Sequence, residues 1–369
     1  MTDDPRLTPI AMTLPSTVPF VGPEASERAT GNAFDARLGA NESAFGPSPL
    51  AIAAMQDAMA DTWMYGDPES HDLRAALAAN HRVHPDNVMI GEGIDGLLGL
   101  LVRLFVSQGD AVVTSAGAYP TFNYHVTGFG GVIHTVPYAG DHEDPARLIA
   151  TARDVGAKLI YIANPDNPMG TYHKAPVIER MIEAVPDGCL LILDEAYVEF
   201  APQDAAPAIA PDDPRVIRMR TFSKAYGMAG ARVGYAVGNA DVINAFHKVR
   251  NHFGMNRTSQ IGAIAALQDD AHLSDVIARV QKSRDRIAAI AYENGLVTVP
   301  SVTSFVAIDC GQDGAFAKRV VQELGKRGVF VRMPFVAPQD RCIRVSCGPD
   351  AMMASFAKAL PDALIAART

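Results

Sequence analysis

Several chemical signatures are missing from this chain of 369 residues. Its four cysteines include no closely spaced pair that would ligate a metal or form a redox motif, so we expect free thiols. Its 10 histidines include no His-Glu-x-x-His arrangement, and we predict no metal site. Gly-x-Ser-x-Gly is absent as well, which argues against a serine hydrolase.

Positive charge and long apolar runs are also scarce. The formal net charge is -9, with no basic footprint, so we expect no nucleic-acid partner. No apolar run has the length needed to span a bilayer, and we expect no membrane partner. The first five residues carry two aspartates and lack the basic start of a signal peptide, which favours a cytoplasmic location.

What the chain does contain is an alternation of short apolar runs and helix-length stretches. Several runs are continuously apolar, as expected for strands buried on both faces of a sheet. This alternation predicts an α/β fold with a mostly parallel sheet, followed by a smaller α+β unit. The expected strands are 111–114, 132–136, 159–162, 190–193, 216–219 and 233–237, and the expected helices include 49–61, 73–81, 93–105 and 175–184.

The most informative segment runs from Thr221 to Arg232. It places Lys224 beside the hydroxyls of Thr221 and Ser223, with Arg232 eight positions further on (232 − 224 = 8). A lysine can form a Schiff base with an aldehyde, while hydroxyls and a guanidinium can hold phosphate oxygens. A cofactor with both groups, such as pyridoxal 5'-phosphate, fits this set.

Other polar residues follow the predicted strands. Asp194 ends one apolar run, where it could pair with a protonated ring nitrogen or simply cap a helix. Asn167 lies in a loop that also reads as an ordinary turn. Tyr119 could stack on a planar ring or be an ordinary tyrosine.

A glycine-led segment and two arginines are further candidates. The segment Gly93, Ile94 and Asp95 opens a leucine-rich helix, whose free N–H groups suit a phosphate, although plain turns look similar. Arg344 and Arg332 lie in or beside predicted strands, where each could bind a substrate carboxylate or be solvated.

Taken in order along the chain, these residues resemble a known family. Tyr65, Tyr119, Asn167, the Asp194–Tyr197 segment and the Thr221–Arg232 block stand as in fold-type I pyridoxal-phosphate-dependent aminotransferases of class I/II. Within that group the chain is most similar to histidinol-phosphate aminotransferases, from Asn41 to the C-terminal arginine strand. The lysine-to-arginine block is the most specific part of the resemblance.

The resemblance implies a role for each residue. Lys224 would form the internal aldimine and shuttle the proton, Asp194 would pair with the pyridine nitrogen, and Tyr197 would bond the ring hydroxyl together with Asn167. Tyr119 would stack on the ring. The phosphate would be held by Gly93, Ile94, Asp95, Thr221, Ser223 and Arg232, and by Tyr65 of a neighbouring subunit. The substrate would be bound by Arg344, with Arg332, Asn41 and Phe20 as further candidates.

The resemblance also implies the architecture. We expect the aspartate aminotransferase fold, with a seven-stranded, mostly parallel sheet in a large cofactor-binding domain (48–265) and a small C-terminal domain (266–369). Residues 1–47 would form an arm that joins the small domain and the dimer. The active form would be a homodimer.

The implied reaction transfers an amino group to a keto acid such as 2-oxoglutarate. Four positions depart from the family pattern: Met169, the Ser43–Phe45 step, Ser304, and an arm segment (18–22) that lacks a tyrosine. The donor is therefore expected to be histidinol phosphate or an aromatic or other bulky amino acid. A pyridoxal-phosphate-dependent decarboxylase of the threonine-phosphate type remains the alternative.

Overall fold

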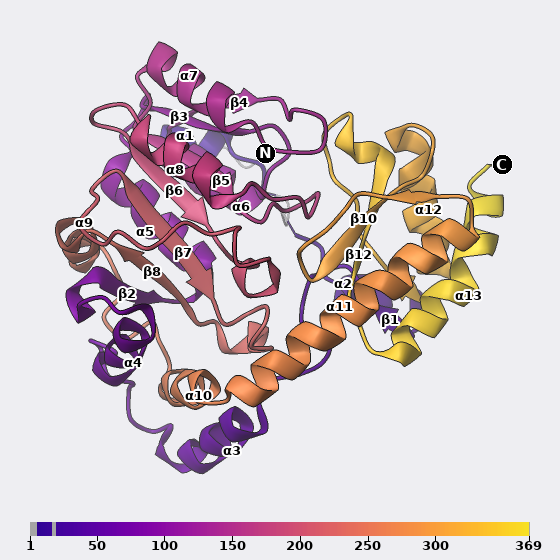
Figure 1. The fold of residues 1–369 in the computed structure, drawn as a ribbon, viewed down its shortest axis with the longest axis horizontal. Helices are drawn as coiled ribbons and strands as arrows, with labels where there is room; N and C mark the ends of the chain where they lie inside the picture. The colour runs from indigo at the N-terminus through magenta and orange to yellow at the C-terminus, as the bar shows by residue number, and fades with distance from the viewer. Residues whose placement is uncertain (1–5, 17–19, 369) are drawn as a thin grey trace.

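The computed structural model describes residues 6–16 and 20–368, and its centre is a seven-stranded sheet (Figure 1). The strand order is β2-β8-β7-β6-β5-β3-β4. The five strands from β7 to β4 are parallel, while β8 runs antiparallel to both β7 and β2. The strands are β2 (Val88–Gly91), β3 (Ala111–Ser115), β4 (Val132–Val136), β5 (Leu159–Ala163), β6 (Leu190–Asp194), β7 (Val216–Thr221) and β8 (Gly234–Gly238).

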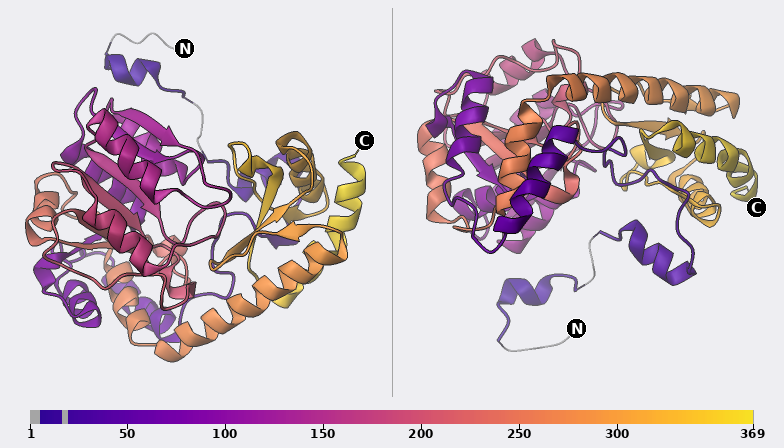
Figure 2. Two further views of the ribbon diagram at one scale, coloured as in Figure 1. Left: turned by 45° about the horizontal axis from the view of Figure 1, so that its top comes forward. Right: turned by 90° about the horizontal axis from the view of Figure 1, so that it is seen from below.

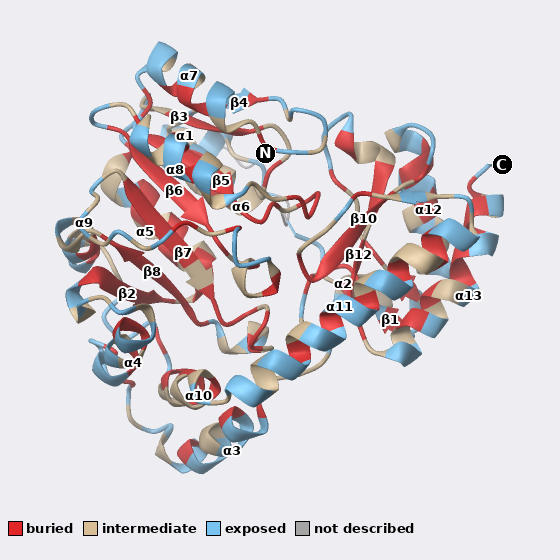
Figure 3. Ribbon diagram, in the orientation of Figure 1, coloured by how far each residue is buried: buried red, intermediate tan, exposed pale blue. Residues whose placement is uncertain are grey.

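Helices cover both faces of this sheet. Along β5, Leu159 and Tyr161 pack in one apolar cluster with α5 and α6, while Ile160 and Ile162 pack in another with α7 and α8. Burial on both faces explains why β5 and β6 are continuously apolar (Figure 3). The helices of this unit are α3 (Pro49–Asp57), α4 (His71–His81), α5 (Gly93–Phe105), α6 (Pro120–Gly128), α7 (Pro145–Val155), α8 (Ala175–Glu183), α9 (Ala240–Ala245) and α10 (Arg257–Leu267).

A second, smaller unit follows, and the long helix α11 (Asp270–Glu293) runs between the two units (Figure 1). The antiparallel sheet of the smaller unit has the order β12-β10-β9. A buried apolar cluster joins Ala36 and Leu38, from near the N-terminus, to α12 and α13. The elements are β9 (Val297–Thr298), β10 (Phe305–Asp309), β11 (Val329–Phe330), β12 (Cys342–Ser346), α12 (Gly314–Lys326) and α13 (Asp350–Ala366).

The N-terminal segment has more regular structure than the sequence indicated. It contains α1 (Pro9–Thr13), α2 (Pro23–Thr30) and β1 (Ala36–Arg37), none of which the sequence predicted. Proline at the start of both helices and Thr8 as an N-cap favour these short turns. The strand β1 pairs in parallel with β11, and α1 and α2 lie at the edge of the molecule (Figure 2).

The expected helices and strands were otherwise placed within a few residues. The expected helix 49–61 ends as α3 at Asp57 and continues as a 3-10 turn, and the antiparallel strand β2 was not anticipated. All four cysteines are free and buried. Over the described ranges, no helix is long and apolar enough to cross a membrane, and no group of three or more potential ligands could hold a metal ion.

Candidate active site

The carboxyl ends of the parallel strands open onto a cavity between the two units. Its volume is about 370 Å³, large enough for a small organic molecule. Asp194 ends β6 and Thr221 ends β7, while Tyr119 and Asn167 follow β3 and β5. Arg332 and Arg344 line the opposite wall from the smaller unit. Side chains distant in sequence therefore meet because parallel strands end at one edge.

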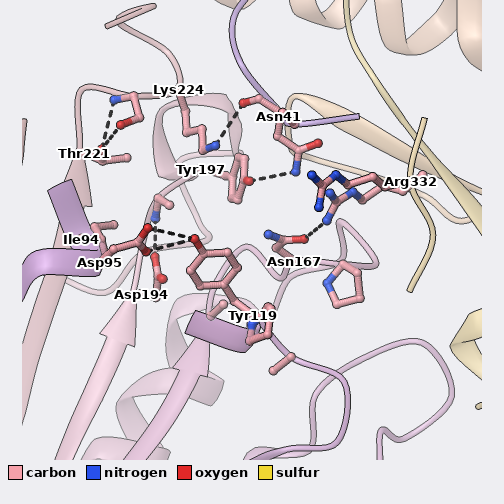
Figure 4. Close-up of a pocket in the computed structure, with 18 of the residues that line it drawn as sticks. Asn41, Ile94, Asp95, Tyr119, Asn167, Asp194, Tyr197, Thr221, Lys224 and Arg332 are labelled. Atoms are coloured by element: carbon pink, nitrogen blue, oxygen red, sulfur yellow. Dashed lines mark hydrogen bonds between the residues drawn. The ribbon is translucent and has the colours of Figure 1, made fainter. Parts of the chain in front are cut away.

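Lys224 extends into this cavity from the loop after β7. Its Nζ donates a hydrogen bond to the backbone oxygen of Asn41 at 3.1 Å and lies 5.6 Å from the ring centre of Tyr197 (Figure 4). None of the described residues forms an ion pair with Lys224 at salt-bridge distance. A primary amine without a bound carboxylate is available for reaction with a carbonyl group.

Asp194 is a buried carboxyl group on the floor of the cavity. Burial raises its pKa to about 6, although hydrogen bonds from the Tyr161 hydroxyl (2.6 Å) and the Ala196 N–H (2.9 Å) oppose the increase. The ionised form is therefore only partly compensated, and a cationic nitrogen placed in the cavity would stabilise it further.

An anion-binding cradle lies at the start of α5. This helix has no side-chain cap, so its first N–H groups are free, and the Thr221 hydroxyl donates to Ser223 Oγ at 2.9 Å close by. Arg232 donates to the same Ser223 oxygen at 3.3 Å. Gly93 has φ 79, and a Cβ there would collide with the Arg232 guanidinium. Glycine is therefore required for Arg232 to reach the helix N-terminus, and together these groups suit a phosphate.

Tyr119 closes one side of the cavity. Its hydroxyl donates to Asp95 Oδ1 at 3.0 Å, and burial is the main cause that raises its pKa (Figure 4). The tyrosine is thus held as a neutral phenol with its ring fixed against the cavity. Asp95 also lies 4.0 Å from the Arg232 guanidinium, which links this wall to the cradle.

Two guanidinium groups face the cavity from the smaller unit. Arg344 donates to the side-chain oxygen of Asn167 and to the backbone oxygen of Gly39 (3.1 Å). Arg332 donates to the backbone oxygen of Val21 at 2.8 Å and lies 4.2 Å from the ring centre of Phe20. Burial lowers the pKa of both arginines. Neither arginine forms an ion pair with a carboxylate among the described residues that would offset this effect.

Asn41 and Tyr197 complete the wall beside Lys224. The amide nitrogen of Asn41 donates to the Tyr197 hydroxyl at 3.1 Å, and Ser346 holds the amide oxygen at 2.9 Å. Asn41 has φ 55, a left-handed conformation that asparagine tolerates better than most residues. The strained backbone turns its carbonyl group toward Lys224.

Nearly all of the predicted site residues lie at this cavity. Gly93 does not line it but supports Arg232, and Tyr65 lies outside it, 75% exposed and stacked on Phe253 at 4.5 Å. Tyr161 was missed because it stands in a continuously apolar strand, where its hydroxyl was the one polar signal. Val18 and Pro19, in the arm segment without a tyrosine, lie outside the described residues.

Comparison with known proteins shows the class of protein to which this chain belongs. The fold is shared with aspartate aminotransferase from Thermus thermophilus in complex with maleate (TM-score 0.79, 21% identity, covering 96% of this chain and 99% of that one). A family model of class I and II aminotransferases matches residues 36–360. The chain therefore belongs to the class I and II aminotransferase family.

More similar proteins carry a narrower name. A histidinol-phosphate aminotransferase from Anaeromyxobacter sp. (strain Fw109-5) is 37% identical over 89% of this chain and 90% of its own length. The crystal structure of histidinol-phosphate aminotransferase from Sinorhizobium meliloti, in complex with pyridoxal-5'-phosphate, is 51% identical with a TM-score of 0.96 and covers 99% of both chains. These matches favour transamination over the decarboxylase alternative.

Proposed function

We propose that the protein transfers the amino group of histidinol phosphate to a keto acid such as 2-oxoglutarate, using pyridoxal 5'-phosphate. The observation that carries this proposal is the combination, around one cavity, of an amine without an ion-pair partner, a buried carboxyl group with a raised pKa and an anion cradle. These groups match the aldehyde, the ring nitrogen and the phosphate of the cofactor in turn. Lys224, Asp194 and the Thr221–Ser223–Arg232 cradle would hold it.

The two arginines favour a strongly anionic substrate. Arg344 and Arg332 form a bridge through their backbones (2.6 and 3.3 Å), which brings two cations with no bound carboxylate to one wall. Bringing like charges together in a buried site is unfavourable unless an anion joins them. A phosphate ester with two negative charges meets this need better than an uncharged aromatic side chain, so the aromatic or bulky amino acid is the second candidate.

Each residue then has a definite task. The bound cofactor supplies an electron sink for the bond broken at the substrate α-carbon. Lys224 Nζ would take the proton from that carbon and return it to the adjoining carbon of the cofactor, while Asp194 would pair as a carboxylate with the ring nitrogen. Tyr197 and Asn167 would form hydrogen bonds with the ring hydroxyl, and the Tyr119 ring would restrict movement of the cofactor.

We also propose a homodimer with the domains 48–265 and 266–369 and an arm, 1–47. Tyr65 supports the dimer because it stands exposed with Trp63 (81%) and Phe253 (52%), an apolar group that a second subunit would cover. In that arrangement Tyr65 would reach the cofactor phosphate of the partner. A cytoplasmic location is part of the same proposal, consistent with four buried free thiols.

A spectral titration tests the proposal. The purified protein with pyridoxal 5'-phosphate should show a long-wavelength band that Lys224→Ala lacks. Histidinol phosphate should bleach the band, and 2-oxoglutarate should restore it while glutamate forms. If only phenylalanine or tyrosine bleaches the band, the amino donor is an aromatic amino acid and not histidinol phosphate. Release of carbon dioxide without a keto acid would show a decarboxylase.

A further inference from the structure

An ion pair joins the two units beside the cavity and has no part in the reaction described so far. Arg341, the residue before β12, donates from Nη2 to both side-chain oxygens of Asp141, at 3.1 and 3.0 Å. Asp141 lies in the loop between β4 and α7, which extends toward the smaller unit (Figure 1). The Nε of Arg341 donates to Asp309 Oδ2 at 2.7 Å, at the end of β10. One guanidinium therefore binds a carboxylate of each unit.

A second contact joins the same segments beside the ion pair. Gln339 is buried and donates from its side chain to the backbone oxygen of Gly140 at 2.9 Å. The side chains of Arg341 and Asp141 are each 27% exposed. An isolated ion pair on the surface contributes little because water and salt screen it, whereas this pair is sheltered and accompanied by further hydrogen bonds. The two units are therefore fixed to each other at this point.

The backbone of Asp141 is tied to the loop that carries Asn167. The Thr171 hydroxyl donates to the backbone oxygen of Asp141 at 2.9 Å, and the Asp166 N–H donates to the backbone oxygen of Thr171 at 2.9 Å. Asn167 is the next residue, and its side-chain oxygen accepts from Arg344. Two hydrogen bonds thus connect Asp141 to one wall of the cavity.

Arg341 is connected to the same wall along β12. Only two residues separate Arg341 from Arg344, and all five residues of β12 pair with β10, so the two arginines keep a fixed separation. The ion pair with Asp141 and the contact between Asn167 and Arg344 therefore close a ring that crosses the boundary between the units twice. Release of Asp141 from Arg341 opens this ring and loosens the contact between Asn167 and Arg344.

We propose that Asp141 and Arg341 are positioning residues that align Arg344 with Asn167 and thereby set the affinity of the cavity for an anionic group. Neither Asp141 nor Arg341 lines the cavity, so both act through Arg344. A guanidinium binds an anion through two parallel hydrogen bonds only when its plane is correctly oriented, so a small displacement weakens binding. The inference rests on the proposed function only in taking Arg344 as the anion-binding group.

Three substitutions test the ring of contacts. Asp141→Asn removes the charge and retains the size of the side chain. Thr171→Val removes the hydroxyl that ties the backbone of Asp141 to the Asn167 loop, and it tests the same ring if the first variant does not fold. Asp213→Asn is the matched control, because Asp213 accepts from Arg215 at 2.9 and 2.8 Å within the larger unit, at the end of β7 remote from the cavity.

Calorimetric titration of the holoenzyme with sulfate measures anion affinity, because sulfate keeps its charge and is not a substrate. In Asp141→Asn the dissociation constant should rise roughly tenfold, an effect of the size typical for coupled sites, and Thr171→Val should raise it in the same direction. In Asp213→Asn it should stay within about twofold of the wild type. Absence of sulfate binding to the wild type would overturn the proposal, because Arg344 would then not be an anion-binding group.

The background Arg344→Lys separates positioning from a general loosening of the protein. A lysine ammonium rotates freely and needs no fixed orientation, so adding Asp141→Asn to Arg344→Lys should change the dissociation constant by less than about twofold. The proposal is overturned if Asp141→Asn leaves sulfate binding unchanged, if the loss is equal in both backgrounds, or if Asp213→Asn causes a similar loss. Failure to turn over histidinol phosphate would instead count against the proposed function, since the sulfate titration uses no amino donor.

Discussion

The raised pKa of Asp194 predicts a stability difference that reverses when the cofactor binds. In the cofactor-free protein the pKa rises from 3.8 to about 6, chiefly through burial. Each pKa unit corresponds to about 1.4 kcal/mol, so the change amounts to about 3 kcal/mol. Because the folded pKa is higher, this stability is fully present below pH 3.8 and is lost as the pH rises through about 6.

Asp194→Asn lacks this dependence, because an amide does not titrate. The free energy of unfolding of the cofactor-free variant, minus that of the wild type, should therefore increase by about 3 kcal/mol from below pH 4 to above pH 6. Other titrating groups cancel in this difference. Urea denaturation at several pH values measures it. Glu199→Gln removes another buried acid, whose pKa burial raises to about 7, so this variant should show an increase of its own.

The bound cofactor should reverse the preference. A cationic ring nitrogen beside Asp194 stabilises the carboxylate, so above pH 6 the wild-type holoenzyme should be the more stable of the two and should bind pyridoxal 5'-phosphate more tightly. A pH-independent difference in the cofactor-free proteins would refute the burial argument. Equal cofactor affinity would refute the pairing with the ring nitrogen.

Three further predictions concern other parts of the molecule. Arg344→Lys should lower kcat/KM for histidinol phosphate by roughly thirtyfold, about 2 kcal/mol, mostly through KM, because an ammonium group cannot offer an anion the two parallel hydrogen bonds that a guanidinium can. Steady-state kinetics measures this. Glu195→Gln should reduce the free energy of unfolding by about 3 to 5 kcal/mol, since Arg218 and Arg220 would lose their shared buried partner, and denaturation at neutral pH would detect it. Mixing Tyr65→Phe with Lys224→Ala should give hybrid dimers with one site free of both substitutions, whose cofactor affinity matches the wild type; affinity that remains low would contradict a role across the dimer.

The sequence predicted most of the central architecture because the constraint there is local. Strands such as β5 and β6 are buried on both faces, so their positions are apolar up to the functional Asp194 at the end of β6, and that pattern is visible without a structure. The short helices α1 and α2 were missed because five to eight residues give too little periodicity. The edge strand β2 (Val88–Gly91) was not anticipated either.

The sequence also predicted part of the chemistry of the site. The block from Thr221 to Arg232 places an amine, hydroxyls and a guanidinium within a dozen residues, so the groups that suit a phosphate and an aldehyde are specified by adjacency in the chain. Tyr119, Asn167 and Asp194 each follow or end a different strand, which indicated that their side chains lie at the same edge of the sheet.

The tertiary structure decided which residues distant in the sequence lie in contact. Only the fold places Tyr161 against Asp194, sets Arg344 beside Asn167, and buries Glu143 against Ser115. These contacts control protonation, since burial and neighbouring charges act through space and leave no mark in the local sequence. The sequence by itself determined which reactive groups are present, and the packing of the two units decided which charges those groups carry.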